Sequence, residues 1–112
     1  MNAAAIDLDD KFAPIRKGLL EFAVLRVIAG EKLYVAEMIQ RLADTEFATQ
    51  EGTLYPLLSR LRRENLVDYE WRESGSGPPR KYYRLTDAGQ RALDQLQDYW
   101  QHLSETLNSI GK

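Results

Sequence analysis

The sequence contains no cysteine and only one histidine, which removes two common kinds of functional site. Without thiols, the chain has neither disulfides nor thiolate metal sites. His102 has no acidic ligands around it at metal-binding spacing, and the chain shows no set of nucleophile, base and acid. Its glycine-rich loop precedes a predicted strand, which is the wrong context for binding phosphate. We therefore expect no metal, no cofactor and no enzymatic activity.

Long apolar runs are missing as well. No stretch approaches the ~20 apolar residues needed to span a bilayer, and the N-terminus lacks a basic segment followed by an apolar one. We expect a soluble, cytoplasmic protein that does not associate with membranes. At 112 residues the chain should form one domain. Such a domain buries only about two-thirds of its unfolded surface, so pairing with a second copy would add stability.

A large excess of one charge is also absent, but the charges are unevenly distributed. The net charge is −2, yet residues 60–84 carry seven basic side chains against four acidic ones. Both ends are acidic: residues 1–15 carry three acidic side chains against one basic one, and residues 85–112 carry four against two. A basic segment between acidic ends is typical of a protein that contacts nucleic acid through one surface.

Hydrophobic spacing predicts a mainly α-helical chain with one small β-hairpin. Residues 1–14 are expected to form an N-terminal arm, which Pro14 separates from the first helix. Alternating apolar and polar side chains predict two strands around a Gly/Ser/Pro loop. Thr86 is expected to cap the last helix. The elements expected after the arm are helices at 15–29, 35–42 and 50–65, strands at 67–72 and 80–85, and a helix at 86–112.

The start of the third helix stays open because of Pro56. Thr53 as the N-cap would put Pro56 in the first turn, where proline is tolerated, whereas Thr49 as the N-cap would put a kink at Pro56. Leu54, Leu58 and Leu61 should form the inner face of this helix in either case. Asn65 is expected to end it.

This order of elements is that of a winged helix-turn-helix with a dimerising C-terminal helix. Two strands are too few for an independent sheet, so the hairpin should lean on the helices as a wing. Trp71 is expected to pack between that wing and the core. The predicted domains are an N-terminal arm at 1–14, a winged helix-turn-helix DNA-binding domain at 15–85 and a dimerisation helix at 86–112.

The third helix and the hairpin supply the candidate DNA contacts. An arginine can hold a guanine with two hydrogen bonds, and a hydroxyl can reach a base edge or a phosphate. Basic residues beside the loop can neutralise phosphates. A solvated helix face and a charged edge that prevents strand aggregation are the alternative interpretations. The candidates are Thr53, Tyr55, Ser59 and Arg60 for the groove, Arg63 for the backbone, and Arg72, Ser74, Arg80 and Lys81 on the wing.

The last helix carries a heptad pattern that predicts a homodimer. Its apolar residues occupy the a and d positions of a coiled-coil seam for over two heptads. Trp100 at an a position is unusual, and it either packs on the partner subunit or faces a flat aromatic ligand. Asp98 and Glu105 near the seam would favour a cationic ligand. The predicted interface residues are Leu93, Leu96, Trp100, Leu103, Leu107 and Ile110.

Two blocks of the sequence carry a resemblance to a known family. They are Glu51-Gly52-Thr53-Leu54-Tyr55-Pro56-Leu57-Leu58 and Gly77-Pro78-Pro79-Arg80-Lys81-Tyr82-Tyr83-Arg84-Leu85-Thr86-Asp87-Ala88-Gly89. Both closely resemble the PadR-type transcriptional regulators, which are named for repression of phenolic acid decarboxylase. The resemblance covers about residues 15–107 and is densest at 51–89. The short C-terminus resembles the small subgroup of that family that keeps a single C-terminal dimerisation helix.

The resemblance implies a homodimer with a recognition helix in the major groove and a wing near the minor groove. It also implies repression that a small molecule releases. We therefore expect a sequence-specific regulator that binds a pseudo-palindromic operator in double-stranded DNA, with a small aromatic or cationic effector. The alternative is a winged-helix module that binds protein and not DNA, because fold alone does not settle function.

Overall fold

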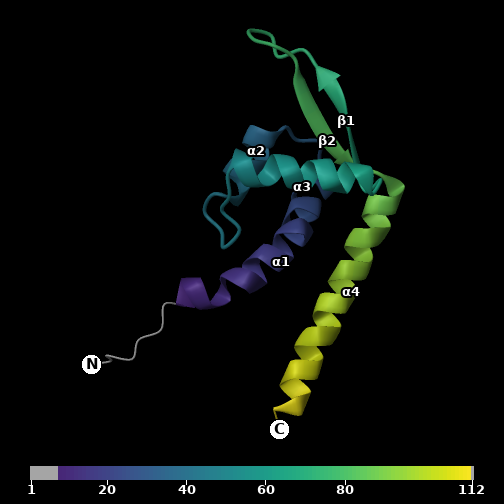
Figure 1. The fold of residues 1–112 in the computed structure, drawn as a ribbon. Helices are drawn as coiled ribbons and strands as arrows, with labels where there is room; N and C mark the ends of the chain where they lie inside the picture. The colour runs from purple at the N-terminus through teal and green to yellow at the C-terminus, as the bar shows by residue number, and fades with distance from the viewer. Residues whose placement is uncertain (1–7, 112) are drawn as a thin grey trace, which may run out of the picture.

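The computed structural model describes residues 8–111, which form four helices and one two-stranded antiparallel sheet. The hairpin projects from one side of α3, and α1 and α4 run away from the other side (Figure 1). This arrangement confirms a mainly α fold with a small β-wing and a long C-terminal helix. The elements are α1 (Leu8–Ala29), α2 (Val35–Leu42), α3 (Glu51–Arg63), β1 (Val67–Arg72), β2 (Arg80–Leu85) and α4 (Asp87–Ile110).

The first helix is longer than predicted. It begins at Leu8 and contains Pro14, so residues 8–14 do not form a separate arm; residues 1–7 lie outside the described residues. The prediction treated Pro14 as a boundary. A proline removes one hydrogen bond to the preceding turn, but its fixed φ is compatible with helix on both sides.

The structure decides between the two predicted starts of α3: its N-cap is Gln50, one residue after the Thr49 alternative, and Thr53 lies inside the helix. The Gln50 carbonyl accepts from the backbone amides of Thr53 and Leu54, at 3.0 Å each. Pro56 therefore lies inside the helix and not in its first turn.

The predicted end of α3 is confirmed. Asn65 has a φ of 62°. Its amide donates to the Arg62 carbonyl at 3.0 Å, and the Leu66 amide donates to the Leu61 carbonyl at 2.9 Å. These two bonds close the helix with a left-handed residue, a conformation that asparagine tolerates well.

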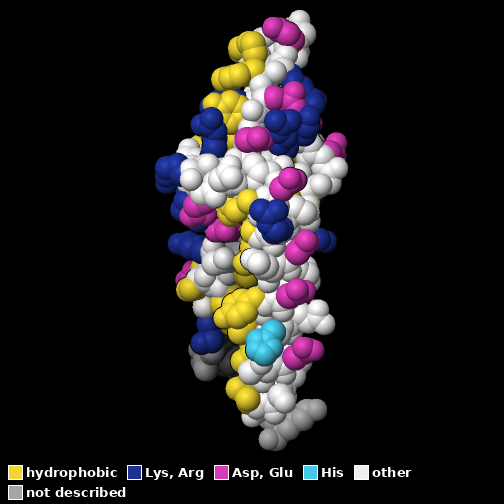
Figure 2. All heavy atoms as spheres, turned by 90° about the vertical axis from the view of Figure 1, so that its right-hand side faces the viewer, with side chains coloured by type: hydrophobic (Ala, Val, Ile, Leu, Met, Phe, Trp, Pro, Cys, Tyr) yellow, Lys and Arg dark blue, Asp and Glu magenta, His cyan; other side chains and the backbone are white. Residues whose placement is uncertain are grey.

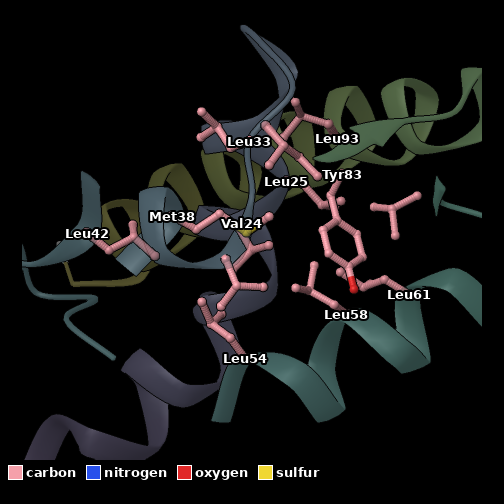
Figure 3. Close-up of a cluster of buried hydrophobic side chains, with 13 residues drawn as sticks. Val24, Leu25, Leu33, Met38, Leu42, Leu54, Leu58, Leu61, Tyr83 and Leu93 are labelled. Atoms are coloured by element: carbon pink, nitrogen blue, oxygen red, sulfur yellow. The ribbon is translucent and has the colours of Figure 1, made fainter. Parts of the chain in front are cut away.

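The core lies where α1, α2, α3 and the base of the hairpin meet (Figure 3). The inner face of α3 is buried as predicted. Tyr83 from β2 and Leu93 from α4 reach the same cluster, so the wing and the last helix are both packed on it. The buried side chains are Val24, Leu25, Ile28, Leu33, Val35, Met38, Leu42, Leu54, Leu58, Leu61, Val67, Tyr83 and Leu93.

The hairpin is fastened to the connection between α1 and α2. Its strands pair from Val67 with Leu85 to Arg72 with Arg80. The Tyr83 amide donates to the Leu33 carbonyl at 2.8 Å, and the Leu33 amide donates back at 3.2 Å. Lys32 forms an ion pair with Glu70 on β1. The wing therefore has a defined direction relative to α3.

None of the helices in residues 8–111 has the length and apolar character needed to cross a membrane.

Candidate nucleic-acid interface

Two hollows separate α3 from the wing. The first, about 460 Å³, lies beside the N-terminal half of α3 and includes Tyr34, Tyr55, Trp71 and Arg80 in its lining. The second, about 480 Å³, lies beside the C-terminal half and is lined by Ser59, Arg62 and Arg63, among others. We call them the N-terminal hollow and the C-terminal hollow. Lys81 and Tyr83 line both, so the hollows form one continuous face.

Aromatic rings hold the cationic groups of this face in place. The Arg80 guanidinium lies 4.5 Å from the centre of the Tyr34 ring. Lys81 and Arg62 both lie 4.6 Å from the centre of the Tyr69 ring. Such contacts orient a cation without neutralising its charge.

The same cations have no acidic partner within the described part of the chain. Across residues 8–111, no carboxylate lies within ion-pair distance of Arg62, Arg63, Arg80 or Lys81. Figure 2 shows basic side chains in the upper part of the molecule, where the hairpin and α3 lie. The face can therefore offer positive charge to a polyanion.

Other basic groups of the wing are already paired. Arg84 donates to Asp68 at 2.6 Å, and this hydrogen bond raises the pKa of the Arg84 guanidinium. Glu70 lies near Lys32, Arg72 and Arg84, and its hydrogen bond with Lys32 lowers the pKa of the Glu70 carboxyl. Arg72 also lies 4.7 Å from the centre of the Tyr82 ring, so this candidate is only partly available.

Three candidates lie away from the shared face. Thr53 lines a separate hollow against α1. The Arg60 guanidinium donates to Glu21 of α1 at 2.8 Å and to Glu64 at 3.2 Å, and these bonds raise its pKa. The Ser74 hydroxyl is covered and has no hydrogen-bond partner among the described residues. Tyr55, Ser59, Arg63, Arg80 and Lys81 are thus the candidates that the fold brings together.

Sequence reasoning missed Arg62 and misplaced Trp71. Arg62 follows Tyr55 by seven residues and Ser59 by three, so helical spacing alone puts all three on one face. Trp71 is 61% exposed and lines the N-terminal hollow, so the prediction that it packs on the core is wrong. Trp71 shares its face of β1 with the buried Val67, but burial falls along the strand toward the loop, so the end of the strand extends beyond the core.

The predicted dimer residues divide into two groups. Leu93 is buried in the core of its own chain, and Leu96 packs against that core, because the first turns of α4 lie on α1. Leu93 is thus not available to a partner, which corrects the prediction. Trp100, Leu103, Leu107 and Ile110 are exposed. They belong to an apolar stripe that runs down α4 (Figure 2).

Trp100 also lines an apolar groove between α4 and α1. The groove measures about 280 Å³, and its other lining residues are Leu19, Phe22, Ala23, Arg26 and Phe47. A flat aromatic molecule fits such a lining, and Arg26 supplies one positive charge at its edge. Asp98 and Glu105 do not line the groove. The part of the chain that the structure describes holds no cluster of side chains suited to a metal ion.

Comparisons with known proteins point to one family. The model of the "Transcriptional regulator PadR-like family" matches residues 24–95. A PadR-like transcription factor from Bacteroides fragilis is 44% identical, with a TM-score of 0.78 over 90% of this chain and 98% of that one. A PadR family regulator from Eggerthella lenta is 34% identical, with a TM-score of 0.83 over 92% and 90%. A transcriptional regulator of Mycobacterium tuberculosis is 31% identical over 80 residues, which is 71% of this chain and 74% of that protein.

Proposed function

The chain belongs to the PadR-like family of transcriptional regulators, and from this we propose that it is a cytoplasmic, homodimeric repressor of transcription. It binds a pseudo-palindromic operator in double-stranded DNA, and a small molecule releases it. The observation that carries the DNA-binding part is the shared face of α3 and the wing. There, Arg62, Arg63, Arg80 and Lys81 keep their charge unpaired by any carboxylate of the described residues.

Each part of this face has a distinct role on the duplex. The exposed Tyr55 and Ser59 of α3 face the major groove, where hydroxyl groups can read base edges. Arg80 and Lys81 neutralise backbone phosphates beside the groove, which fixes the register of the protein on the duplex. Arg60, which Glu21 holds on the side of α3 toward α1, serves the packing of the helix more than the reading of bases. Thr53 lines the hollow on that same side.

Selection of bound genomic fragments by the purified protein would identify the operator, and its affinity should then be measured over a range of salt concentrations. Lys81→Ala removes one phosphate contact per subunit, so the log–log salt slope of the dimer should fall by about 1.8. Arg84→Ala is the matched control on the same strand, because Asp68 already neutralises that guanidinium. Its slope should stay close to that of the wild type.

Absence of duplex affinity at low salt would contradict the proposal and favour a module that binds protein. The net charge of −2 is the observation on the side of that second candidate. A Lys81→Ala variant whose salt slope equals that of the wild type would remove the wing from the contact surface.

The effector site proposed for release is the groove lined by Trp100. Its lining is almost entirely apolar, and Arg26 opposes a cationic ligand, so we expect a flat aromatic compound that is neutral or anionic. Binding should quench the emission of Trp100. Arg26→Gln should weaken the binding of an anionic aromatic compound more than that of a neutral compound of the same shape. Equal losses of affinity for the two compounds would exclude a charge contact at this edge.

A further inference from the structure

Trp71 is exposed on the wing without a partner that covers its ring. Its side chain is 61% exposed, although it lies in the regular part of β1, opposite Lys81. The Tyr69 ring meets it edge-on with ring centres 6.1 Å apart, and the Lys81 ammonium lies 5.4 Å from its centre. The half-exposed Tyr55 lines the same hollow, so two large exposed rings are grouped there, which points to a partner that covers them.

The surroundings of Trp71 indicate the chemistry of that partner. The N-terminal hollow brings its indole together with Tyr55 of α3 and with Arg80 and Lys81 of β2. The two cations have no carboxylate partner in residues 8–111 and suit phosphates, whereas an indole face suits an apolar ring. A nucleic-acid backbone presents both, because apolar faces of deoxyribose alternate with phosphates along each strand.

We propose that Trp71 is a DNA-contacting residue of the wing, whose indole packs on a deoxyribose of the strand neutralised by Arg80 and Lys81. The inference rests on the proposed function and adds a contact to it. One strand of the duplex lies in the N-terminal hollow, between Tyr55 and the wing. The contact is apolar, so it strengthens binding without releasing counterions.

A structural role is the competing explanation. Trp71 and Lys81 are a directly opposed pair across the hairpin, and such pairs stabilise sheets. Truncation of Trp71 could then weaken DNA binding only by displacing Lys81. The two roles differ in a direct observable, because only a contact residue loses its exposure to water when DNA binds.

The decisive experiment uses the wild-type protein labelled with 5-fluorotryptophan. The sequence holds two tryptophans, so fluorine NMR gives two environments, and the Trp71→Phe variant assigns them. Addition of operator DNA should move the Trp71 resonance and reduce its solvent isotope shift by about half or more. An unchanged Trp71 resonance in protein that binds DNA overturns the inference and leaves the proposed function standing. If the wild type binds no duplex, both fail.

Affinity measurements provide the second arm. Trp71→Ala should weaken operator binding about tenfold with an unchanged salt slope, and Trp71→Phe should recover most of the affinity. Lys81→Ala should instead flatten the slope. A flatter slope in Trp71→Ala would mean that the indole only positions Lys81, and would overturn the assignment.

Discussion

At Gly89 the backbone of α4 passes close to the segment that follows α3. A Cβ at this position would lie 1.9 Å from the Leu66 carbonyl oxygen. That oxygen accepts from the Thr86 amide at 3.1 Å. The Thr86 hydroxyl donates to the Asn65 carbonyl at 2.7 Å and accepts from the Gly89 amide at 2.9 Å. The start of α4 is therefore fixed to the end of α3 through backbone groups that have little freedom to move.

Gly89→Ala should destabilise the fold by about 2–4 kcal/mol, because the added methyl displaces α4 from the Leu66 carbonyl. Gly18→Ala is the matched control. That glycine lies inside α1 with open space around it, so alanine should be neutral or stabilising by up to about 1 kcal/mol. Urea unfolding followed by circular dichroism measures both. Equal stability of the two variants would contradict the close approach.

Arg60 joins α3 to α1 through Glu21. The pair has a spacing of 39 residues in the sequence and is half exposed, so its energy should be modest. We expect a double-mutant cycle of Arg60→Ala and Glu21→Ala to give a coupling of about 0.5–1 kcal/mol in unfolding experiments. The salt slope of DNA binding should change less in Arg60→Ala than in Lys81→Ala. If the effects of the two substitutions on stability are additive, and Arg60→Ala lowers the salt slope of DNA binding by about 1.8, Arg60 is instead a DNA contact.

At the scale of elements, the position of the wing depends on Glu70. Lys32 and Arg84 reach this one carboxylate from outside β1, so it connects the wing to the segment after α1. The Lys32 hydrogen bond holds the pKa of Glu70 below its ordinary value of 4.5. A lowered pKa in the folded state stabilises the protein above pH 4.5, and this stabilisation is lost as the pH falls through the lowered pKa.

Glu70→Gln should therefore lower the melting temperature at neutral pH, and the gap to the wild type should narrow as the pH falls below about 4.5. Glu73→Gln removes an equal charge from the adjacent loop, and Glu73 forms no ion pair within the described residues. The melting temperature of this variant should stay close to that of the wild type at every pH. Thermal melts between pH 3 and pH 7 provide the comparison. If the difference in melting temperature between Glu70→Gln and the wild type does not depend on pH, the Glu70 carboxylate contributes no ion-pair stabilisation.

Local patterns predicted the elements better than they predicted the faces. Strands at 67–72 and 80–85 agree with the structure because the first alternates apolar and polar side chains and a loop rich in glycine and proline separates the two. Pro14 gave a wrong start for the first helix and Pro56 left the start of α3 open, because local rules treat proline as a boundary and the helices continue through both. Glu21, which holds Arg60 against α1, lies 39 residues away from it in the sequence. No periodicity distinguishes a side chain that faces α1 from one that faces solvent.

At the scale of the whole molecule, the C-terminal half of α4 lacks a partner among the described residues. Trp100 and Leu103 are 42% and 36% exposed, and exposure rises to 66% at Leu107 and 72% at Ile110. Near its start the same helix packs on the core of its own chain through Leu93 and Leu96. The exposed stripe therefore begins at Trp100, about two turns after the first residue of the predicted seam. A second copy of the chain can cover this stripe, and the two recognition helices would then be related by a twofold axis.

Leu107→Asp places a negative charge in the middle of the stripe. In a twofold dimer, the two introduced carboxylates, one from each subunit, would lie close together. The dissociation constant of the dimer should rise at least about 100-fold, because burial of an unpaired carboxylate costs several kcal/mol. Sedimentation velocity at micromolar concentration should then show a single subunit, and operator affinity should fall because one half-site no longer assists the other. Gln101→Asp adds the same charge on an exposed position of α4 outside the stripe and should leave the dimer intact. A Leu107→Asp protein that sediments like the wild type would move the dimer interface away from α4.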